Sequence, residues 1–179
     1  MQELIDAFSL DRVSKAGARF QPDKAKWFNA QYMHHKSDAE LAEIYQPILR
    51  EHGIEVSDET AGFVAGIMKE RATFASELWD LTSYFFVAPT EYDEKSLKKR
   101  WKEDSPKHMT EMLALLEAQE DWSAEGLDNL IMPWIAEKEY GVGVVMNAFR
   151  ICLVGAARGP HIWNITDVLG KEETLARVR

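Results

Sequence analysis

The residues best suited to chemistry in this sequence lie close together near its C-terminal end. Arg150 is followed by Arg158, Pro160, His161 and Trp163. Planar guanidinium groups, a rigid ring and aromatic rings are the groups that hold unstacked nucleic-acid bases through stacking and edge contacts. The alternative is an ordinary surface hairpin of two helices with arginines on it, and the residue types alone favour this plainer interpretation.

The other reactive residue types do not combine into an independent active site. Adjacent helical residues such as His34 and His35 point about 100° apart, so they do not converge on one metal ion. Cys152 lies in an apolar run with no activating base nearby, which predicts an inert thiol in the core. There is no glycine-rich phosphate loop after a strand. We therefore expect no catalytic residue and no metal site in this chain.

Two helices that meet at a corner must position the C-terminal candidates. The first has an apolar face with helical spacing, made of Val145, Ala148, Phe149, Cys152 and Leu153. Gly155 and the sequence AARGP then predict a turn. Pro160 suits the first position of a second helix because its missing N–H has no helical partner there, and Gly170 suits the end of that helix.

Composition is typical of a soluble globular protein. Hydrophobic residues make up 46% of the 179 residues and charged residues 28%. No apolar run reaches the roughly 18 residues that would span a bilayer, and no signal-peptide pattern is present. A single cysteine excludes an internal disulfide framework and suits a reducing compartment. We expect a cytoplasmic protein without a membrane partner.

The net charge of −9 limits the kind of nucleic-acid binding that is possible. A protein that coats phosphates without regard to sequence normally presents a strongly basic surface. This chain does so only if its lysines and arginines gather on one face. Recognition of a few exposed bases by shape and edge contacts stays open.

Periodicity and capping residues predict an all-α, multihelical fold. Helix starts are indicated at Asp23, Ser37, Ser57, Ser105–Pro106 and Ser123, and Ser37 with Glu40 has the spacing of a capping box. A further helix is expected from Thr73 to Phe86. We expect two consecutive helical subdomains, 21–88 and 89–179, after a connector over residues 1–20. The aromatic residues expected in or near the cores are Trp27, Phe63, Phe74 and Phe149.

The remaining basic residues have plain structural explanations beside any role in binding. Lys69 and Arg71 end an amphipathic helix, where cations complement the helix dipole. A basic run surrounds Trp101 and forms either a solvated helix face or, together with Arg158, contacts to phosphates. This basic run consists of Lys98, Lys99, Arg100 and Lys102.

Several stretches in order resemble one family. KWFNAQY, IMKERATFASEL, FRICLVG and GPHIWNITDVLGKEETLARV are similar to the C-terminal, anticodon-binding part of bacterial glutamyl-tRNA synthetase, from about Phe8 to Arg179. The resemblance implies a class I synthetase helical module that binds the anticodon arm of tRNA(Glu). It also implies a longer enzyme that attaches glutamate to that tRNA with ATP and Mg²⁺.

The catalytic signatures of that family do not occur in the chain. Neither a HIGH-like motif nor a KMSKS-like loop is present, and RVSKAG belongs to the connector over residues 1–20. We therefore expect a fragment, inactive alone, without a cofactor of its own. Its expected partners are the tRNA and the missing catalytic domain, and it is expected to be a monomer.

The resemblance also implies individual binding residues. Arg71 matches an arginine next to the third anticodon base, and Arg150 matches an arginine of the anticodon site. The loop that packs against the anticodon bases is matched by Gly159, Pro160, His161 and Ile162. The chain differs from the family at two positions of this loop. It has Gly159 where family members can have a residue with a hydroxyl group, and His161 where they can have glycine. These differences alter the contacts expected at the first two anticodon bases.

Two other functions stay open beside anticodon binding. One is a helical protein-interaction module with no RNA role, which Arg71 and Arg150 on opposite faces would favour. The other is a diverged relative that binds a mimic of the anticodon and not tRNA.

Overall fold

The computed structural model describes residues 2–13, 17 and 19–179. These residues form ten α-helices and no strand, which confirms the all-α prediction. The helices are α1 (Gln2–Ala7), α2 (Pro22–His35), α3 (Asp38–Glu51), α4 (Asp58–Met68), α5 (Leu78–Thr82), α6 (Glu94–Arg100), α7 (Ser105–Ala118), α8 (Ala124–Glu137), α9 (Val142–Val154) and α10 (Ile162–Val178). Four short 3₁₀ helices accompany them: η1 (Leu10–Arg12), η2 (Lys69–Arg71), η3 (Ala75–Glu77) and η4 (Ser83–Phe85).

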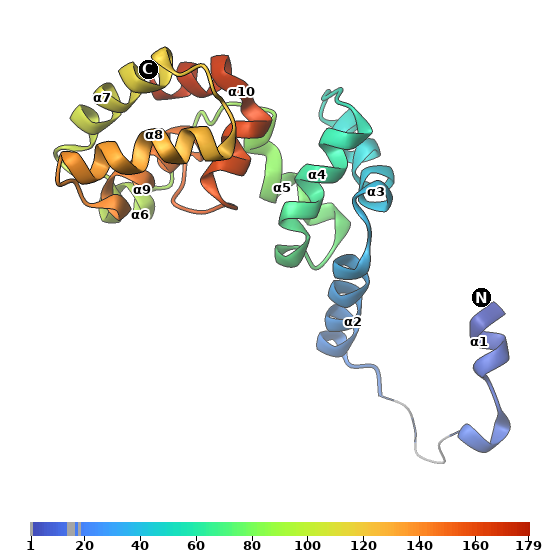
Figure 1. Cartoon of the computed structure of the whole chain (residues 1–179). Helices are drawn as coiled ribbons and strands as arrows, with labels where there is room; N and C mark the ends of the chain where they lie inside the picture. Colours follow the sequence, from blue (N-terminus) through green and yellow to red (C-terminus); the bar gives the residue numbers. More distant parts are fainter. Residues whose placement is uncertain (1, 14–16, 18) are drawn as a thin grey trace.

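The helices form two neighbouring groups (Figure 1). α2 to α5 make up one group, in which α3 packs chiefly against α4. α6 to α10 make up the other, in which α9 contacts α6, α7, α8 and α10. α1 stands apart from both groups in Figure 1. The expected division into a connector over residues 1–20 and two subdomains, 21–88 and 89–179, stays a prediction.

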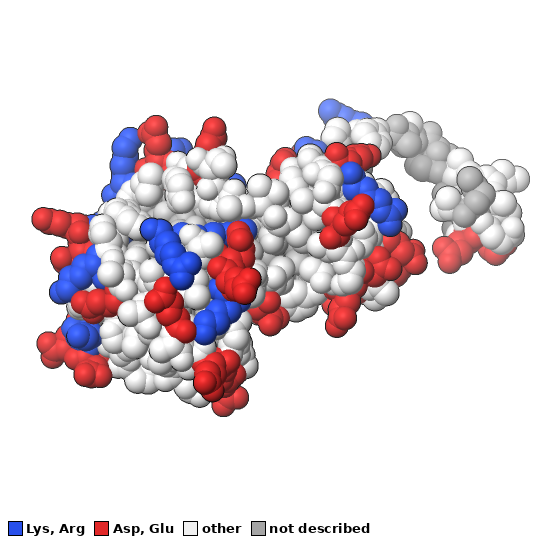
Figure 2. All heavy atoms as spheres, turned by 90° about the horizontal axis from the view of Figure 1, so that it is seen from above, with Lys and Arg blue, Asp and Glu red and all other residues white. Residues whose placement is uncertain are grey.

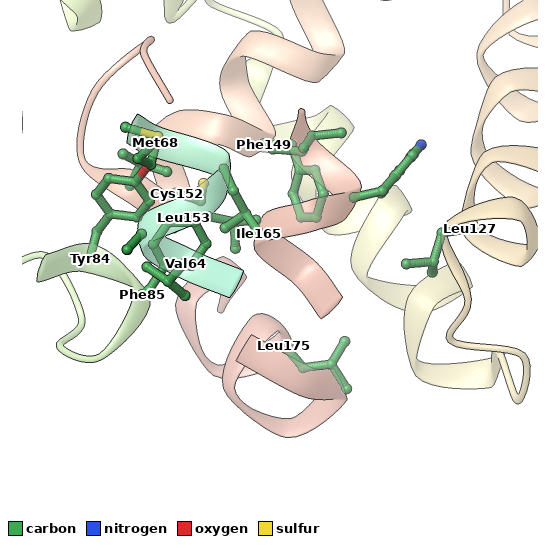
Figure 3. Close-up of a cluster of buried hydrophobic side chains, with 14 of the residues drawn as sticks. Val64, Met68, Tyr84, Phe85, Leu127, Phe149, Cys152, Leu153, Ile165 and Leu175 are labelled. Atoms are coloured by element: carbon green, nitrogen blue, oxygen red, sulfur yellow. The ribbon is translucent and has the colours of Figure 1, made fainter. Parts of the chain in front are cut away.

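One continuous cluster of buried side chains joins the two groups. Figure 3 shows Val64 and Met68 of α4 beside Tyr84, Phe85 and Leu153. Tyr84 and Phe85 belong to η4 and Leu153 to α9, so the cluster crosses from the first group into the second. Burial of apolar side chains is the main stabilising contribution in folding, and here it also fixes α9 against the first group.

The local signals for helix starts are mostly confirmed. Ser37 and Glu40 form a complete capping box, and Ser57 and Ser123 each accept a backbone hydrogen bond as N-caps. Gly155 ends α9 with a left-handed φ of 77°. Each of these motifs depends only on residues close in sequence, which explains why the pattern alone reveals it.

Three expectations about helix ends are wrong. Asp23 lies inside the first turn of α2, whose N-cap is Gln21. The segment from Thr73 to Phe86 is not one helix but η3, α5 and η4 in succession. Pro160 precedes α10, whose N-cap is His161. Gly170 is the expected break: its φ of 70° and ψ of 175° interrupt α10.

The expectation about aromatic residues holds for only two of the four. Phe149 is fully buried and Phe63 packs against the core. Trp27 is 57% exposed and Phe74 is 41% exposed. Trp27 instead packs edge-on against Phe28, with ring centroids 5.0 Å apart. α2 contacts the rest of the fold mainly at η2, so most of its aromatic face has no protein surface to cover it.

Candidate nucleic-acid interface

The loop between α9 and α10 is fastened to α9 by Arg150. Its guanidinium Nη1 donates a hydrogen bond of 2.6 Å to the carbonyl oxygen of Pro160. The chain turns at Gly155, where a Cβ atom would lie 2.7 Å from the carbonyl oxygen of Glu91, so glycine is required. The loop therefore has one defined position relative to the helix that carries Arg150.

A pocket of about 380 Å³ lies between this loop and the first group of helices. Arg71 reaches it from η2, and Arg158 and Gly159 reach it from the loop. The pocket is lined by Met68, Arg71, Leu81, Tyr84, Ala157, Arg158 and Gly159. In the part of the chain that the structure describes, this lining contains two arginines and no carboxylate, so it suits an electron-rich ligand.

Three arginines lie near Tyr84. Burial raises the pKa of Tyr84 to about 12, and the charges of Arg71, Arg150 and Arg158 oppose that rise. Tyr84 is 8% exposed, so its hydroxyl lies at the bottom of the pocket. A Cβ atom at Gly159 would lie 3.2 Å from the Tyr84 hydroxyl and 3.3 Å from the Arg150 Nη1, and the Tyr84 hydroxyl and the Arg71 Nη1 both donate to the Met68 Sδ. Arg71 and Arg150 therefore both lie beside Tyr84.

Among the residues that the structure describes, the Arg71 guanidinium has only a weak hydrogen-bond partner. Its Nη1 donates to the Met68 Sδ at 3.8 Å, and the Tyr84 hydroxyl donates to the same sulfur at 3.9 Å. A thioether is a weak acceptor, whereas a guanidinium offers five donors in a fixed plane. The remaining donors of Arg71 are therefore suited to an external ligand.

A second pocket, of about 290 Å³, lies on the other side of Arg150. His161 is exposed at its rim, whereas Ile162 and Trp163 are buried. The Trp163 Nε1 donates to the Asp128 carboxylate at 2.8 Å, which fixes the plane of the indole. The pocket is lined by Asp128, Met132, Val142, Met146, Asn147, Arg150, His161, Ile162 and Trp163.

Gly159 lies between the Tyr84 hydroxyl and the Arg150 guanidinium, where there is little room for a side chain. Its φ of 122° is in a region that residues with side chains rarely adopt. A Cβ atom there would lie 3.2 Å from the Tyr84 hydroxyl and 3.3 Å from the Arg150 Nη1. Glycine at this position therefore keeps Arg150 against the loop and beside Tyr84.

The structure thus brings together most of the predicted site residues. Arg71, Arg158 and Gly159 line one pocket, Arg150, His161 and Ile162 line the other. The Pro160 ring is buried, and its carbonyl oxygen binds Arg150.

Lys98, Lys99 and Arg100 of the basic run are exposed in the last turn of α6, and the exposed Lys102 follows that helix; none of the four lines either pocket. Lys98 pairs with Glu94 at 3.1 Å. α6 is attached to the loop, because the Ala157 N–H donates to the Ser96 Oγ at 3.0 Å. Figure 2 shows basic and acidic residues interspersed on the face it displays, without a large area of one sign. Phosphate contacts by the basic run stay a prediction.

Sequence reasoning missed Tyr84, Met68 and Asp128. Met68 is only three residues before Arg71, the candidate that it contacts. Tyr84 and Asp128 are far along the chain from the candidates beside them: Asp128 is 35 residues from Trp163. No local spacing signals such a contact. Tyr84 lies in the segment expected as one long helix, which hid its position at the base of the pocket.

Other chemistry is not assembled in the described residues. They contain no group of three or more His, Cys, Asp or Glu side chains that could hold a metal ion. Burial raises the pKa of the Cys152 thiol to about 11, so the thiol stays protonated near neutral pH. Among the same residues, none of the helices has the length and hydrophobicity needed to traverse a bilayer.

The sequence is similar to a known protein family and to several enzymes. The sequence profile of the family described as "anticodon binding domain" matches residues 26–179. The chain belongs to this family. It is 55% identical to a glutamate–tRNA ligase of Bacteroides fragilis and 45% identical to one of Flavobacterium johnsoniae, each over 179 residues. These matches include all of this chain but only 35% and 36% of the relatives.

Solved structures agree with the sequence comparison. A crystal structure of a glutamate tRNA ligase from Elizabethkingia meningosepticum matches 99% of this chain with a TM-score of 0.91 and 39% identity. A glutamate–tRNA synthetase structure from Elizabethkingia anophelis matches 99% with a TM-score of 0.86 and 38% identity. The chain covers 35% and 34% of these two structures. The expected fold type and family are therefore confirmed.

Proposed function

We propose that this anticodon-binding domain binds the anticodon arm of tRNA(Glu) as part of a glutamate–tRNA ligase. The observation that carries the proposal is the pocket that Arg71, Arg158 and Gly159 line beside Tyr84, together with the hydrogen bond from Arg150 to Pro160 of the loop 159–162. Arg71 and Arg158 line a pocket to which the described residues contribute no carboxylate, so these arginines suit base edges, and the adjacent aromatic and apolar wall suits base faces.

The two pockets divide the anticodon between them. Arg71 and its pocket take the third base, while Arg150 and the pocket of His161 and Ile162 take the first two. At this second pocket, the exposed His161 offers a ring for stacking where family members can have glycine. The protein-interaction alternative is not favoured, because it gives no reason for the arginines to lie together beside Tyr84.

The relatives are about three times as long as this chain, and their remaining part accounts for catalysis in this proposal. ATP and Mg²⁺ serve that part, and this chain is a monomer that takes no cofactor. The isolated chain is then expected neither to exchange pyrophosphate into ATP with glutamate nor to charge tRNA. Activation of glutamate by the purified chain would contradict this division of roles.

Binding is tested with short RNA hairpins by NMR-monitored titration, which detects weak complexes. A hairpin with a glutamate anticodon is expected to shift resonances near Tyr84 and Arg150. A hairpin with the same stem and a scrambled loop is the control, and it is expected to bind at least about tenfold more weakly. Equal binding of both hairpins would overturn the proposed function.

A further inference from the structure

Arg177, near the end of α10, is a buried arginine that links the two groups of helices. Its side chain is 4% exposed, and its Nε donates to the Glu173 carboxylate at 2.7 Å. Its Nη1 donates to the carbonyl oxygen of Tyr84 at 2.6 Å and to that of Leu153 at 2.8 Å. Both hydrogens of one nitrogen are therefore used to join two distant parts of the backbone.

Both carbonyl groups belong to elements that hold the proposed binding residues. Tyr84 is in η4, and its hydroxyl lies in the pocket of Arg71. Leu153 is in the last turn of α9, three residues after Arg150. Carbonyl groups in the last turn of a helix lack a helical partner, and a cation there complements the helix dipole. Arg177 therefore stabilises the end of α9 and attaches it to η4 at the same time.

We propose that Arg177 is a positioning residue that sets the distance between Arg71 and Arg150, and so the preference for the third anticodon base. This inference rests on the proposed function. The pocket of Arg71 has one wall from the first group and one from the loop that follows α9, so a shift of α9 relative to η4 changes its width. The guanidinium is a rigid planar fork, which resists such a shift better than a single flexible ammonium group.

The test compares Arg177→Met with Arg179→Met. Arg179 lies two residues further along, and it makes an exposed pair with Glu117 at 2.9 Å, so the control also removes one arginine charge. The measured quantity is the ratio of dissociation constants for two hairpins that differ only by C or G at the third anticodon position. Because both hairpins titrate the same protein sample, this ratio does not depend on the folded fraction.

In the unaltered chain, the hairpin with C is expected to bind about tenfold or more tightly than the hairpin with G. A difference of this size is typical when one bidentate contact is lost. Arg177→Met is expected to reduce the ratio at least about threefold, because small displacements of positioned groups weaken such contacts strongly. Arg179→Met is expected to leave it unchanged. An unchanged ratio in Arg177→Met would overturn the inference while the proposed function stands.

If circular dichroism shows that Arg177→Met is unfolded, the same ratio is measured in a second variant, Arg177→Lys. Arg177→Lys keeps the charge and can reach one carbonyl at a time, so its ratio is expected to be lower than that of the unaltered chain. A ratio equal to that of the unaltered chain would then overturn the inference. If the unaltered chain itself shows no preference between hairpins with intact and scrambled loops, the proposed function fails and this inference fails with it.

Discussion

At the scale of single residues, the proposed site concentrates positive charge in a place that is partly dry. Burial lowers the pKa of Arg150, and the nearby charge of Arg71 lowers it further. Charges of the same sign repel more strongly as solvent is excluded. If this site binds a base as proposed, the electron-rich edge of the base is expected to reduce this repulsion.

Arg71 is expected to distinguish C from G at the third anticodon position. Cytosine presents the acceptors N3 and O2 side by side, and a guanidinium can donate to both. Guanine presents N–H donors there, so donor faces donor. We predict that Arg71→Gln narrows the preference for C by about 1–3 kcal/mol. The measurement is charging efficiency of a full-length ligase containing this domain on two transcripts that differ at that base.

The control for Arg71 is Arg50→Gln, an exposed arginine in the last turn of α3. Both positions are near helix ends, where a cation contributes only about 0.3–1 kcal/mol to stability. Both variants are therefore expected to fold, and only Arg71→Gln is expected to change the ratio. Equal ratios in the two folded variants would make Arg71 a helix-end cation without a role in reading the base.

The buried tyrosines predict a loss of stability in alkaline solution. Burial raises the pKa of Tyr45 and of Tyr84 to about 12, whereas an unfolded tyrosine titrates near 10. The folded pKa is the higher one, so the stabilisation is complete below about pH 10 and is lost as the pH rises toward about 12. We expect the free energy of unfolding in urea to fall over this range, and to fall less in Tyr45→Phe. In Tyr32→Phe, which changes an exposed ring, the decline is expected to match the unaltered chain.

At the scale of elements, α9 contributes both to the hydrophobic core and to the proposed binding site. Val145, Phe149 and Leu153 are fully buried on its inner side, and Arg150 extends from its surface to the loop. α2 has the opposite character, with Trp27 and Tyr32 mostly exposed. α9 is richer in apolar residues than α2, and it is also surrounded by more of the protein.

This difference predicts unequal costs for two aromatic truncations. Phe149→Ala is expected to destabilise the chain by about 3–5 kcal/mol, because it leaves a cavity in the core. Trp27→Ala is expected to cost less than about 1 kcal/mol, because the ring is already more than half exposed. Urea unfolding followed by circular dichroism measures both. A larger cost for Trp27→Ala than for Phe149→Ala would contradict the burial that the structure assigns.

The comparison of α9 and α2 also explains which features the sequence could predict. The buried face of α9 and the capping box at Ser37 follow from spacing within one or two turns, and both were predictable. The exposure of Trp27 depends on what packs against α2, which no local pattern reveals. The break between Thr73 and Phe86 has a similar cause: Tyr84 and Phe85 are turned into the shared core, and packing outweighs helix propensity there.

The candidate site was predictable only in part, for the same reason. The residues of the loop are adjacent in sequence, and the family resemblance indicated them together with Arg71. Tyr84 and Arg150 are 66 positions apart in the sequence, and the hydrogen bond from Arg177 to Tyr84 joins residues 93 positions apart. Such contacts follow from the way the two groups pack, so they required the structure.

At the scale of the whole molecule, charge separates this domain from general RNA-binding proteins. The net charge is −9, and acidic residues are interspersed with basic ones on the face in Figure 2. Non-specific binding to polyanions needs a surplus of positive charge over a wide surface. Binding is therefore expected to depend on the pocket contacts, and to be weak in the isolated chain, because a longer ligase gains effective concentration by gripping the same tRNA elsewhere.

This argument predicts a shallow salt dependence. Each phosphate neutralised on a single strand contributes a slope of about −0.7 to log K against log salt, so two to four contacts give about −1.5 to −3. If the basic run touches phosphates, Lys99→Gln is expected to reduce the slope by roughly one contact and to weaken all hairpins equally. Lys24→Gln, a change in α2, is the matched control and is expected to leave the slope unchanged. A steep slope combined with equal binding to random single-stranded RNA would identify a general polyanion surface, and the three arginines around Tyr84 would then not be readers of an anticodon.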